Sequence, residues 1–253
     1  MREITDLKDK IKRYFVFTPL EARSLAIAIL VIAFIFSFKE WGYGSAFDFG
    51  VGLFNYFNAV LIVALSFLVH ISIQRIWALA TGFRLEWKMW SFGLLFALIM
   101  AFLTNGFIWW FILPGGIMLH HMGGHRLGWF RYDINYWALG LTAATGTIAT
   151  IILAIVFKTI GVFVSNDLIG KLIIFNIAYA LCSLLPIPPL DGSRTFYGSR
   201  MFYAFSTAFI VVMSVLLVSN ISLGISLLLS FLAGIAFWIS YYMLFEHRAW
   251  RLP

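Results

Sequence analysis

The sequence predicts an all-α polytopic membrane protein of about six transmembrane helices, with a re-entrant β-hairpin-like segment between the second and third spans. Of its 253 residues, 62% are hydrophobic and 11% are charged, whereas soluble domains carry about 25% charge. Apolar runs of about 20 residues, the length that crosses a bilayer, recur along the whole chain. Basic residues gather in one set of connections between these runs, and this bias orients the spans.

The N-terminal part of the chain predicts a surface helix followed by a first span. Residues 1–19 mix acidic and basic side chains with apolar residues at helical spacing, which is typical of an amphipathic helix on the cytoplasmic surface. Residues 20–55 hold the first span, at 22–38, and then a glycine-rich and aromatic-rich stretch at 41–54. We expect this stretch to be an interfacial loop, because tyrosine and tryptophan favour the membrane–water boundary.

Residues 56–200 form the predicted membrane core, and residues 201–253 add two C-terminal spans and a basic tail. Apolar runs predict spans at residues 56–77, 136–157, 168–185, 201–218 and 221–245. The span that begins at residue 136 is rich in glycine and alanine, which permit close helix packing. No internal repeat or soluble domain is visible, so the sequence predicts a single membrane bundle.

Residues 83–121 allow two interpretations. Residues 83–90 alternate polar and apolar side chains, which indicates a strand, and the apolar run at 92–113 ends in a β-favouring stretch at 107–113. The run either crosses the bilayer or re-enters it. The positive-inside rule favours re-entry, because the basic residues of both termini and of the 75–135 connection then share one side. This arrangement places both termini in the cytoplasm, and we expect a multi-pass protein of the plasma membrane.

The charge of the chain indicates which kinds of partner it can bind, and its cysteine content decides whether it can form an internal disulfide. The net charge of +7 is best explained by basic ends facing an anionic lipid leaflet, so the bilayer itself is an expected partner. A nucleic-acid-binding protein needs a concentrated basic face, and the sequence has none. The single cysteine, Cys182, excludes an internal disulfide and lies inside an apolar run, as expected for a small buried residue.

The most informative segment is residues 185–192, Leu-Pro-Ile-Pro-Pro-Leu-Asp-Gly. Proline lacks a backbone N–H and biases the preceding residue away from helix, so the span must end near Leu185. Asp191 then stands on broken backbone directly after a predicted span, and such an acid is a functional-site hypothesis by default. The predicted topology brings His70, near the end of the second span, to the same cytoplasmic face.

His70 together with the Leu190-Asp191-Gly192 turn resembles the site-2 protease family of intramembrane zinc metalloproteases, in an archaeal-type form. In that family two histidines four residues apart bind zinc, and the glutamate that follows the first histidine is the general base. The aspartate of a Leu-Asp-Gly turn is the third ligand. The resemblance covers about residues 56–200 and implies the family's membrane core.

The resemblance also implies a degenerate catalytic motif. Ile71 stands at the position of the base, and Gln74, whose neutral amide is a poor zinc ligand, stands at the position of the second histidine. A metalloprotease needs a metal-bound water and a base to take its proton. We therefore assign no catalytic residue and expect no cofactor, with zinc on His70 and Asp191 as the alternative.

Three further histidines keep that alternative open. His120, His121 and His125 follow the predicted hairpin, and one of them could replace the missing ligand, or the segment could be a solvent-side polar loop. His70 is either a metal ligand or a structural group hydrogen-bonded to Asp191 or Gln74. Asp191 is either a ligand or a cap of the turn that it begins.

The leading functional hypothesis is an inactive homologue of site-2 proteases that binds a transmembrane segment or another membrane protein. The residues expected to line the partner-binding cleft are Asn105, Pro114, Gly115, Asn176, Pro186, Pro188 and Pro189. One alternative is an active zinc metalloprotease with a rewired site, which uses His70, Asp191 and a histidine of residues 120–125. A second alternative is a structural subunit of a larger membrane complex.

Overall fold

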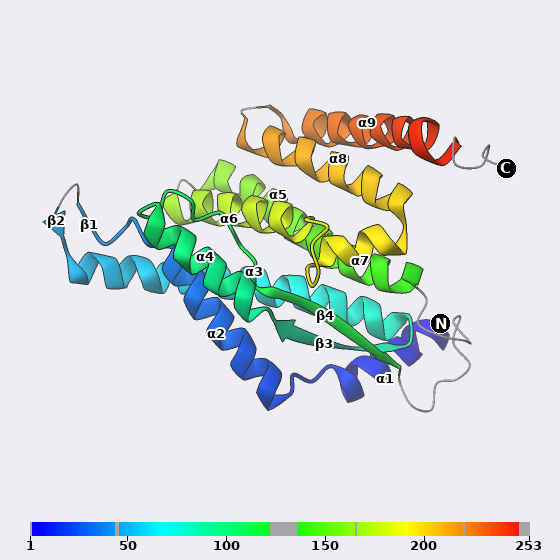
Figure 1. Cartoon of the computed structure of the whole chain (residues 1–253), viewed down its shortest axis with the longest axis horizontal. Helices are drawn as coiled ribbons and strands as arrows, with labels where there is room; N and C mark the ends of the chain where they lie inside the picture. The colour runs from blue at the N-terminus through cyan, green and yellow to red at the C-terminus, as the bar shows by residue number, and fades with distance from the viewer. Residues whose placement is uncertain (1, 44–45, 122–135, 165, 220, 248–253) are drawn as a thin grey trace.

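The computed structural model is a bundle of long helices with two small antiparallel sheets (Figure 1). The structure describes residues 2–43, 46–121, 136–164, 166–219 and 221–247. The elements are α1 (Arg2–Tyr14), α2 (Pro19–Phe36), β1 (Gly42–Tyr43), β2 (Ala46–Phe47), α3 (Phe49–Ala80), β3 (Phe83–Met89), α4 (Ser91–Leu103), β4 (Gly115–His121), α5 (Tyr136–Phe163), α6 (Asp167–Ser183), α7 (Asp191–Gly198), α8 (Arg200–Val218), α9 (Leu223–Tyr241) and a π-helical turn, η1 (Tyr242–Glu246).

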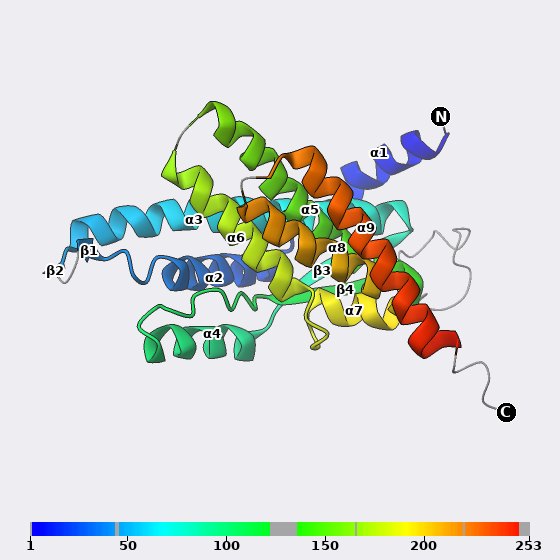
Figure 2. The same cartoon turned by 90° about the horizontal axis from the view of Figure 1, so that it is seen from above.

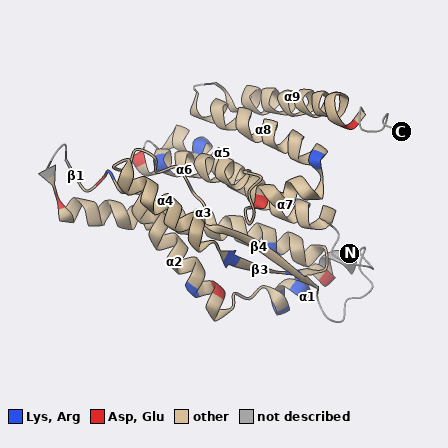
Figure 3. Cartoon of the chain, viewed as in Figure 1, with Lys and Arg blue, Asp and Glu red and all other residues tan. Residues whose placement is uncertain are grey.

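Five of the described helices are long and apolar enough to cross a membrane. They are α2, α3, α5, α8 and α9 with its π-helical turn. The predicted span at 168–185 corresponds to α6, which has 17 residues, and α4 has 13. Charged side chains lie mainly near the helix ends, while the middle of the bundle is nearly free of them (Figure 3). These features confirm a mostly helical structure that is compatible with a polytopic membrane protein, and the number of six spans and the re-entrant segment stay predictions.

The first helices begin where capping residues stand. Thr18 caps α2 in a capping box with Glu21, and Pro19 occupies the first turn, where its missing N–H costs nothing. Asp48 accepts hydrogen bonds from the N–H groups of Gly50 and Val51, so α3 begins at Phe49. The expected interfacial loop at 41–54 is therefore shorter than predicted, and its last six residues are helical.

Residues 83–121 form an excursion from the bundle whose first and last strands, β3 and β4, lie side by side. β3 pairs in antiparallel register with β4, Phe83 opposite His121 and Met89 opposite Gly115. Between the strands α4 runs outward, residues 104–108 form a turn, and residues 109–114 return as irregular chain that belongs to no described strand. The strand at 83–89 was predicted correctly, but its partner follows Pro114 and is not the β-favouring stretch at 107–113. Gly115 allows the pairing, because a Cβ there would lie 2.1 Å from the carbonyl oxygen of Lys88.

The bundle is layered around α5, which packs against α3, α6 and α7. α8 and α9 form an outer hairpin on the α5–α6 side, with α3 on the opposite side of α5 and α6 (Figure 1). Viewed from above, α8 and α9 lie together on the near side of the bundle, over α5 and α6 (Figure 2). The largest buried cluster joins apolar residues of α2, α3, β3, β4, α5 and α6.

A buried ion pair fastens three elements at one end of this core. Arg75 of α3 and Glu21 of α2 are 1% and 4% exposed, and the guanidinium donates to the Glu21 carboxylate and to the carbonyl oxygen of Val16. The same carboxylate accepts the N–H of Trp87 in β3 at 3.0 Å. A buried charge is tolerated when it is paired and hydrogen-bonded in this way.

Candidate functional site

Three residues that the family resemblance singled out, His70, Gln74 and Asp191, meet inside the bundle. His70 and Gln74 lie one turn apart on the C-terminal half of α3, and Asp191 is the first residue of α7. Their exposed fractions are 2%, 0% and 5%. As the prolines predict, α6 ends at Ser183, and residues 184–190 form the turn that delivers Asp191.

Local hydrogen bonds hold the proline turn in place. The Ser193 hydroxyl donates to the Leu190 carbonyl at 2.7 Å, and the Arg194 guanidinium donates to the carbonyl of Pro189. Burial lowers the pKa of Arg194, and the nearby Asp191 carboxylate raises it. The turn is thus closed by its own following helix, and the Asp191 side chain is left to face α3.

One carboxylate oxygen joins both motif positions of α3. Asp191 Oδ2 lies 2.8 Å from His70 Nε2 and accepts a hydrogen bond from Gln74 Nε2 at 2.9 Å. Gln74 Nε2 also donates to the carbonyl oxygen of Ala143 at 3.1 Å, which ties α5 to the cluster. The predicted hydrogen bond between His70 and Asp191 is therefore present, whereas the carboxylate makes no capping bond to the first turn of α7 among the described residues.

The second ring nitrogen of His70 is also engaged. His70 Nδ1 lies 2.8 Å from Thr150 Oγ1, and that hydroxyl donates its single proton to the Gly146 carbonyl at 2.9 Å. The Thr150 hydroxyl and the Asp191 carboxylate therefore hold the imidazole from both ring nitrogens. The ring of Tyr179 covers the imidazole with 4.7 Å between ring centres.

Gly146 makes room for the cluster. A Cβ at this position would lie 2.4 Å from His70 Nε2 and 2.5 Å from Gln74 Nε2. No real side chain tolerates such distances, so only glycine lets α5 approach α3 here. The small residues that predicted close packing of this helix therefore also define the wall of the site.

The residues present do not fit a catalytic zinc centre. Zinc ligands lie about 2.0–2.2 Å from the metal, which in tetrahedral geometry separates two ligand atoms by roughly 3.4 Å. His70 and Asp191 instead make a direct contact of 2.8 Å, and both nitrogens of the imidazole are engaged. Ile71, at the position of the base, is 0% exposed and packs in the apolar core. Over the described residues, no group of three or more histidine, cysteine, aspartate or glutamate side chains is arranged to hold a metal ion.

The histidines that could complete a rewired site are not part of this cluster as far as the structure describes them. His120 of β4 pairs with Glu86 of β3 at 3.1 Å, and both side chains are exposed. It lies four strand residues, or about 13 Å, beyond Gly116, which contacts the proline turn. The side chain of His121 and all of His125 lie outside the described residues.

The expected cleft residues fall into two groups. Pro114, Gly115, Pro186, Pro188 and Pro189 lie at or near the junction of β4 with the proline turn, whereas Asn105 and Asn176 lie away from it. At the junction the elements touch, because a Cβ on Gly116 would lie 1.9 Å from the Pro189 carbonyl oxygen. Asn105 ends the α4 excursion at the far side, with φ of 50°. Asn176 is buried in α6 and donates to the Leu172 carbonyl at 2.8 Å.

Sequence reasoning missed the residues that complete the cluster from neighbouring helices. Thr150 and Gly146 lie one turn apart on α5, and Tyr179 lies on α6. The spacing of a hydroxyl four residues after a glycine, on a helix of small residues, can indicate a buried polar contact. It does not show which residue of a neighbouring helix makes that contact.

Comparisons with known proteins give one distant relationship. A curated protein of Methanocaldococcus jannaschii, named "Putative zinc metalloprotease", is 26% identical over 195 residues, which are 75% of this chain and 90% of the relative. No protein-family model matches the chain. No solved structure matches it. The identity supports a distant, metalloprotease-like relationship.

Proposed function

We propose that this chain is a proteolytically inactive relative of the site-2 intramembrane metalloproteases, and that it binds a transmembrane segment or another membrane protein without cutting it. The distant metalloprotease relative supports the ancestry, since its similarity covers 75% of the chain. The site supports the loss of activity. The ancestry and the inactivity are separate claims, and separate measurements test them.

One observation carries the proposal. At the position where the family holds a metal, His70 and Asp191 bond directly at 2.8 Å, and Gln74 donates to the same carboxylate oxygen. The imidazole of His70 and the amide of Gln74 thus occupy the carboxylate oxygen that a metal would otherwise bind, and they satisfy it in a buried site. Because Ile71 is buried in the core, no side chain stands ready to take a proton from water.

The segment at 107–113, which follows the turn after α4 and forms no strand of its own, is our candidate for the partner-binding edge. The Cys182 thiol donates to the Trp110 carbonyl at 3.0 Å and accepts the Ile112 N–H at 3.4 Å, so α6 holds the segment from one side. A strand with a free edge binds an unwound partner by main-chain hydrogen bonding. Phe107 and Trp110 are exposed and would contact the partner's side chains.

The membrane arrangement that we propose has six spans, formed by the five long apolar helices and α6. The excursion of α4 re-enters the bilayer, because α4 is too short to cross it and β3 and β4 begin and end the excursion together. α1 and the end of α9 lie at the same end of the bundle, which agrees with both termini in the cytoplasm of a plasma-membrane protein (Figure 1). The bilayer is then the first partner of the exposed apolar side chains.

Metal content and cleavage test the inactivity. The full-length protein, purified in mild detergent and supplied with zinc, should retain far less than one zinc per chain and leave transmembrane peptides intact. Near-stoichiometric zinc that disappears in His70→Ala, or chelator-sensitive peptide cleavage, would overturn the proposal.

Restoring the motif tests the ancestry. The double variant Ile71→Glu with Gln74→His rebuilds the family spacing on α3 and should bind about one zinc per chain. The matched control, Ile71→Gln with Gln74→His, keeps the ligands but lacks the base, so it should bind zinc and remain inactive. Failure of both folded variants to bind zinc would argue against a former metal site.

A second candidate is a zinc metalloprotease with a rewired site. It is favoured by two buried oxygens, Gln74 Oε1 and Asp191 Oδ1, which have no hydrogen-bond partner among the described residues. Unpaired buried oxygens are costly unless water or an ion satisfies them. The measurement of zinc content described above separates the two candidates. If zinc is bound, the same measurement on variants of His120, His121 and His125 tests whether one of these histidines is a ligand.

A further inference from the structure

A cavity of about 550 Å³ opens at the opposite end of the bundle from the His70 cluster. Gly50, Val51, Phe54 and Asn55 line it from the first turns of α3, whereas His70 lies 19 residues after Val51 on the same helix. At 1.5 Å per residue the two sites are separated by about 28 Å. The volume is within the range of small-ligand sites in proteins, and neither the motif nor the metalloprotease relationship accounts for it.

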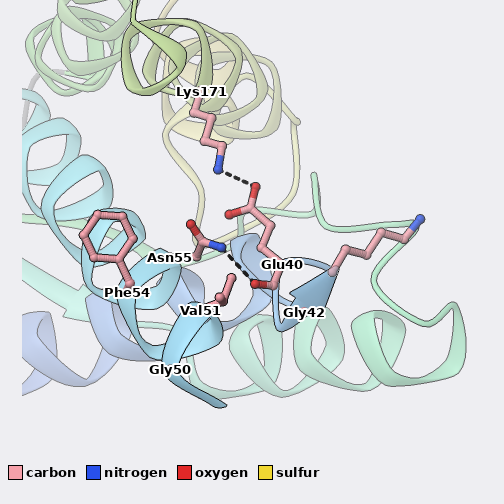
Figure 4. A pocket seen from close by; sticks show the side chains of 8 residues that line it. Glu40, Gly42, Gly50, Val51, Phe54, Asn55 and Lys171 are labelled. Atoms are coloured by element: carbon pink, nitrogen blue, oxygen red, sulfur yellow. Dashed lines mark hydrogen bonds and ion pairs between the residues drawn. The ribbon is translucent and has the colours of Figure 1, made fainter. Parts of the chain in front are cut away.

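The cavity carries charged groups held in defined positions. Lys171 reaches from α6 to the Glu40 carboxylate at 2.6 Å, and Asn55 Nδ2 donates to the Glu40 carbonyl at 2.9 Å (Figure 4). Lys39 also lines the cavity, and its ammonium group lies 4.9 Å from the ring centre of Phe107, which is not among the lining residues. Two lysines against one glutamate leave the cavity with a net positive charge, and the Lys171–Glu40 pair remains about one-third exposed, so a ligand can reach it.

An apolar stripe leads away from the cavity along α3. It consists of Phe54, Phe57, Leu61, Leu65 and Leu68, with exposed fractions of 67%, 62%, 56%, 39% and 44%. Steps of three and four residues place these side chains on one helical face. The stripe begins with Phe54, which itself lines the cavity. A polar, net positive cavity thus continues directly into an exposed apolar face of a membrane-length helix.

We propose that this cavity binds the phosphate-bearing headgroup of an anionic membrane lipid, whose chains lie along the apolar stripe of α3. Lys171 contacts the phosphate, because lysine binds phosphate as a flexible point charge, and Lys39 adds positive charge nearby. Glu40 holds Lys171 in position while the site is empty and competes with the phosphate for it. Binding here is separate from the His70 cluster, so it holds whether or not the chain is a pseudoprotease.

Lipid binding is measured on the delipidated, full-length protein in detergent by native mass spectrometry, with phosphatidylglycerol as probe and phosphatidylcholine as the uncharged comparison. The wild type should bind phosphatidylglycerol more tightly, and Lys171→Gln should weaken that binding about tenfold through loss of a charge-assisted contact. Lys88→Gln, which removes an exposed lysine from β3 at the other end of the bundle, should change it less than twofold.

Two further arms distinguish a lipid site from its alternatives. Glu40→Gln removes the competing carboxylate and should tighten phosphatidylglycerol binding several-fold, whereas a purely structural ion pair would make it weaker or unchanged. Phe57→Ser on the stripe should weaken binding of the lipid but not of inorganic phosphate. Equal affinity of the wild type for both lipids, or full displacement of lipid by millimolar inorganic phosphate, would overturn the proposal.

Discussion

The two ends of α3 carry opposite kinds of polar site. Near its C-terminal end, His70 and Gln74 are buried, and the ring nitrogens of His70 and the amide nitrogen of Gln74 bond to other groups of the chain. Near its N-terminal end, Asn55 lines an open cavity whose ion pair is one-third exposed. The first site lies where the sequence predicted a motif and is filled by side chains of the chain itself, whereas the second was predicted by no motif and is open.

This difference shows that a motif and a binding capacity are separate properties. A motif records residue types at a spacing, but whether a ligand can enter depends on which groups already satisfy one another. Substitutions should therefore affect the two ends differently: the buried cluster should respond in stability, and the cavity should respond in binding. The predictions below follow this contrast from the largest expected effect to the smallest.

Asp191→Ala should have the largest effect, a loss of about 3 kcal/mol in the free energy of unfolding. It leaves His70 and Gln74 as buried donors without their shared acceptor. Thermal unfolding in detergent measures the effect, and Asp167→Ala, at an exposed first turn of α6, is the control, with an expected loss below about 1 kcal/mol. Equal losses for the two variants would contradict a satisfied internal cluster.

Gly146→Ala should lower the free energy of unfolding by about 2 kcal/mol, because the added methyl overlaps His70 and Gln74. Gly170→Ala is its matched control: a Cβ there meets nothing within 4 Å, and alanine favours helix by roughly 1 kcal/mol. The two glycine substitutions should therefore have opposite signs in the same unfolding measurement. If Gly146→Ala stabilised the protein, α5 would not pack closely against His70 and Gln74 at this position.

Thr150→Val should cost about 1 kcal/mol, since it removes the hydroxyl partner of His70 Nδ1 at nearly constant volume. Thr159→Val serves as control, because that hydroxyl bonds only its own helix at the exposed end of α5 among the described contacts. If Thr150→Val proved as mild as its control, the imidazole would have another partner for Nδ1.

Lys171→Gln should have the smallest effect on stability, within about 0.5 kcal/mol, because partly exposed ion pairs contribute little. The same variant should show the tenfold loss of phosphatidylglycerol binding described above. A loss of stability that approaches that of Asp191→Ala would mean that the open end is a structural site and would remove the contrast between the two ends.

The sequence predicted the helical class well because apolar periodicity and length are local properties. Helix boundaries differed from the predicted ones where a capping side chain decides the first residue, as Asp48 does for α3. The strand at 83–89 was predicted, but its partner was not, since alternation reveals a strand and not its pairing: β4 begins at Gly115, after the β-favouring stretch at 107–113.

The candidate site was predictable only as far as its motif reached. His70 and Asp191 were expected at one depth, and they lie in contact. Thr150 and the cavity around Lys171 could not be found, because their roles depend on which helices become neighbours.

The buried pair of Glu21 and Arg75 has a consequence for how the protein is made. Glu21 stands at the start of the first apolar helix, but Arg75 follows 54 residues later and the N–H of Trp87 follows 66 residues later. During synthesis this end of α2 cannot settle into its final environment until β3 has left the ribosome. Nascent chains that end before residue 87 should therefore keep the start of α2 accessible to solvent. The order of assembly at this end of the bundle is set by Glu21, whose carboxylate is fully paired only after Arg75 and Trp87 have been synthesised.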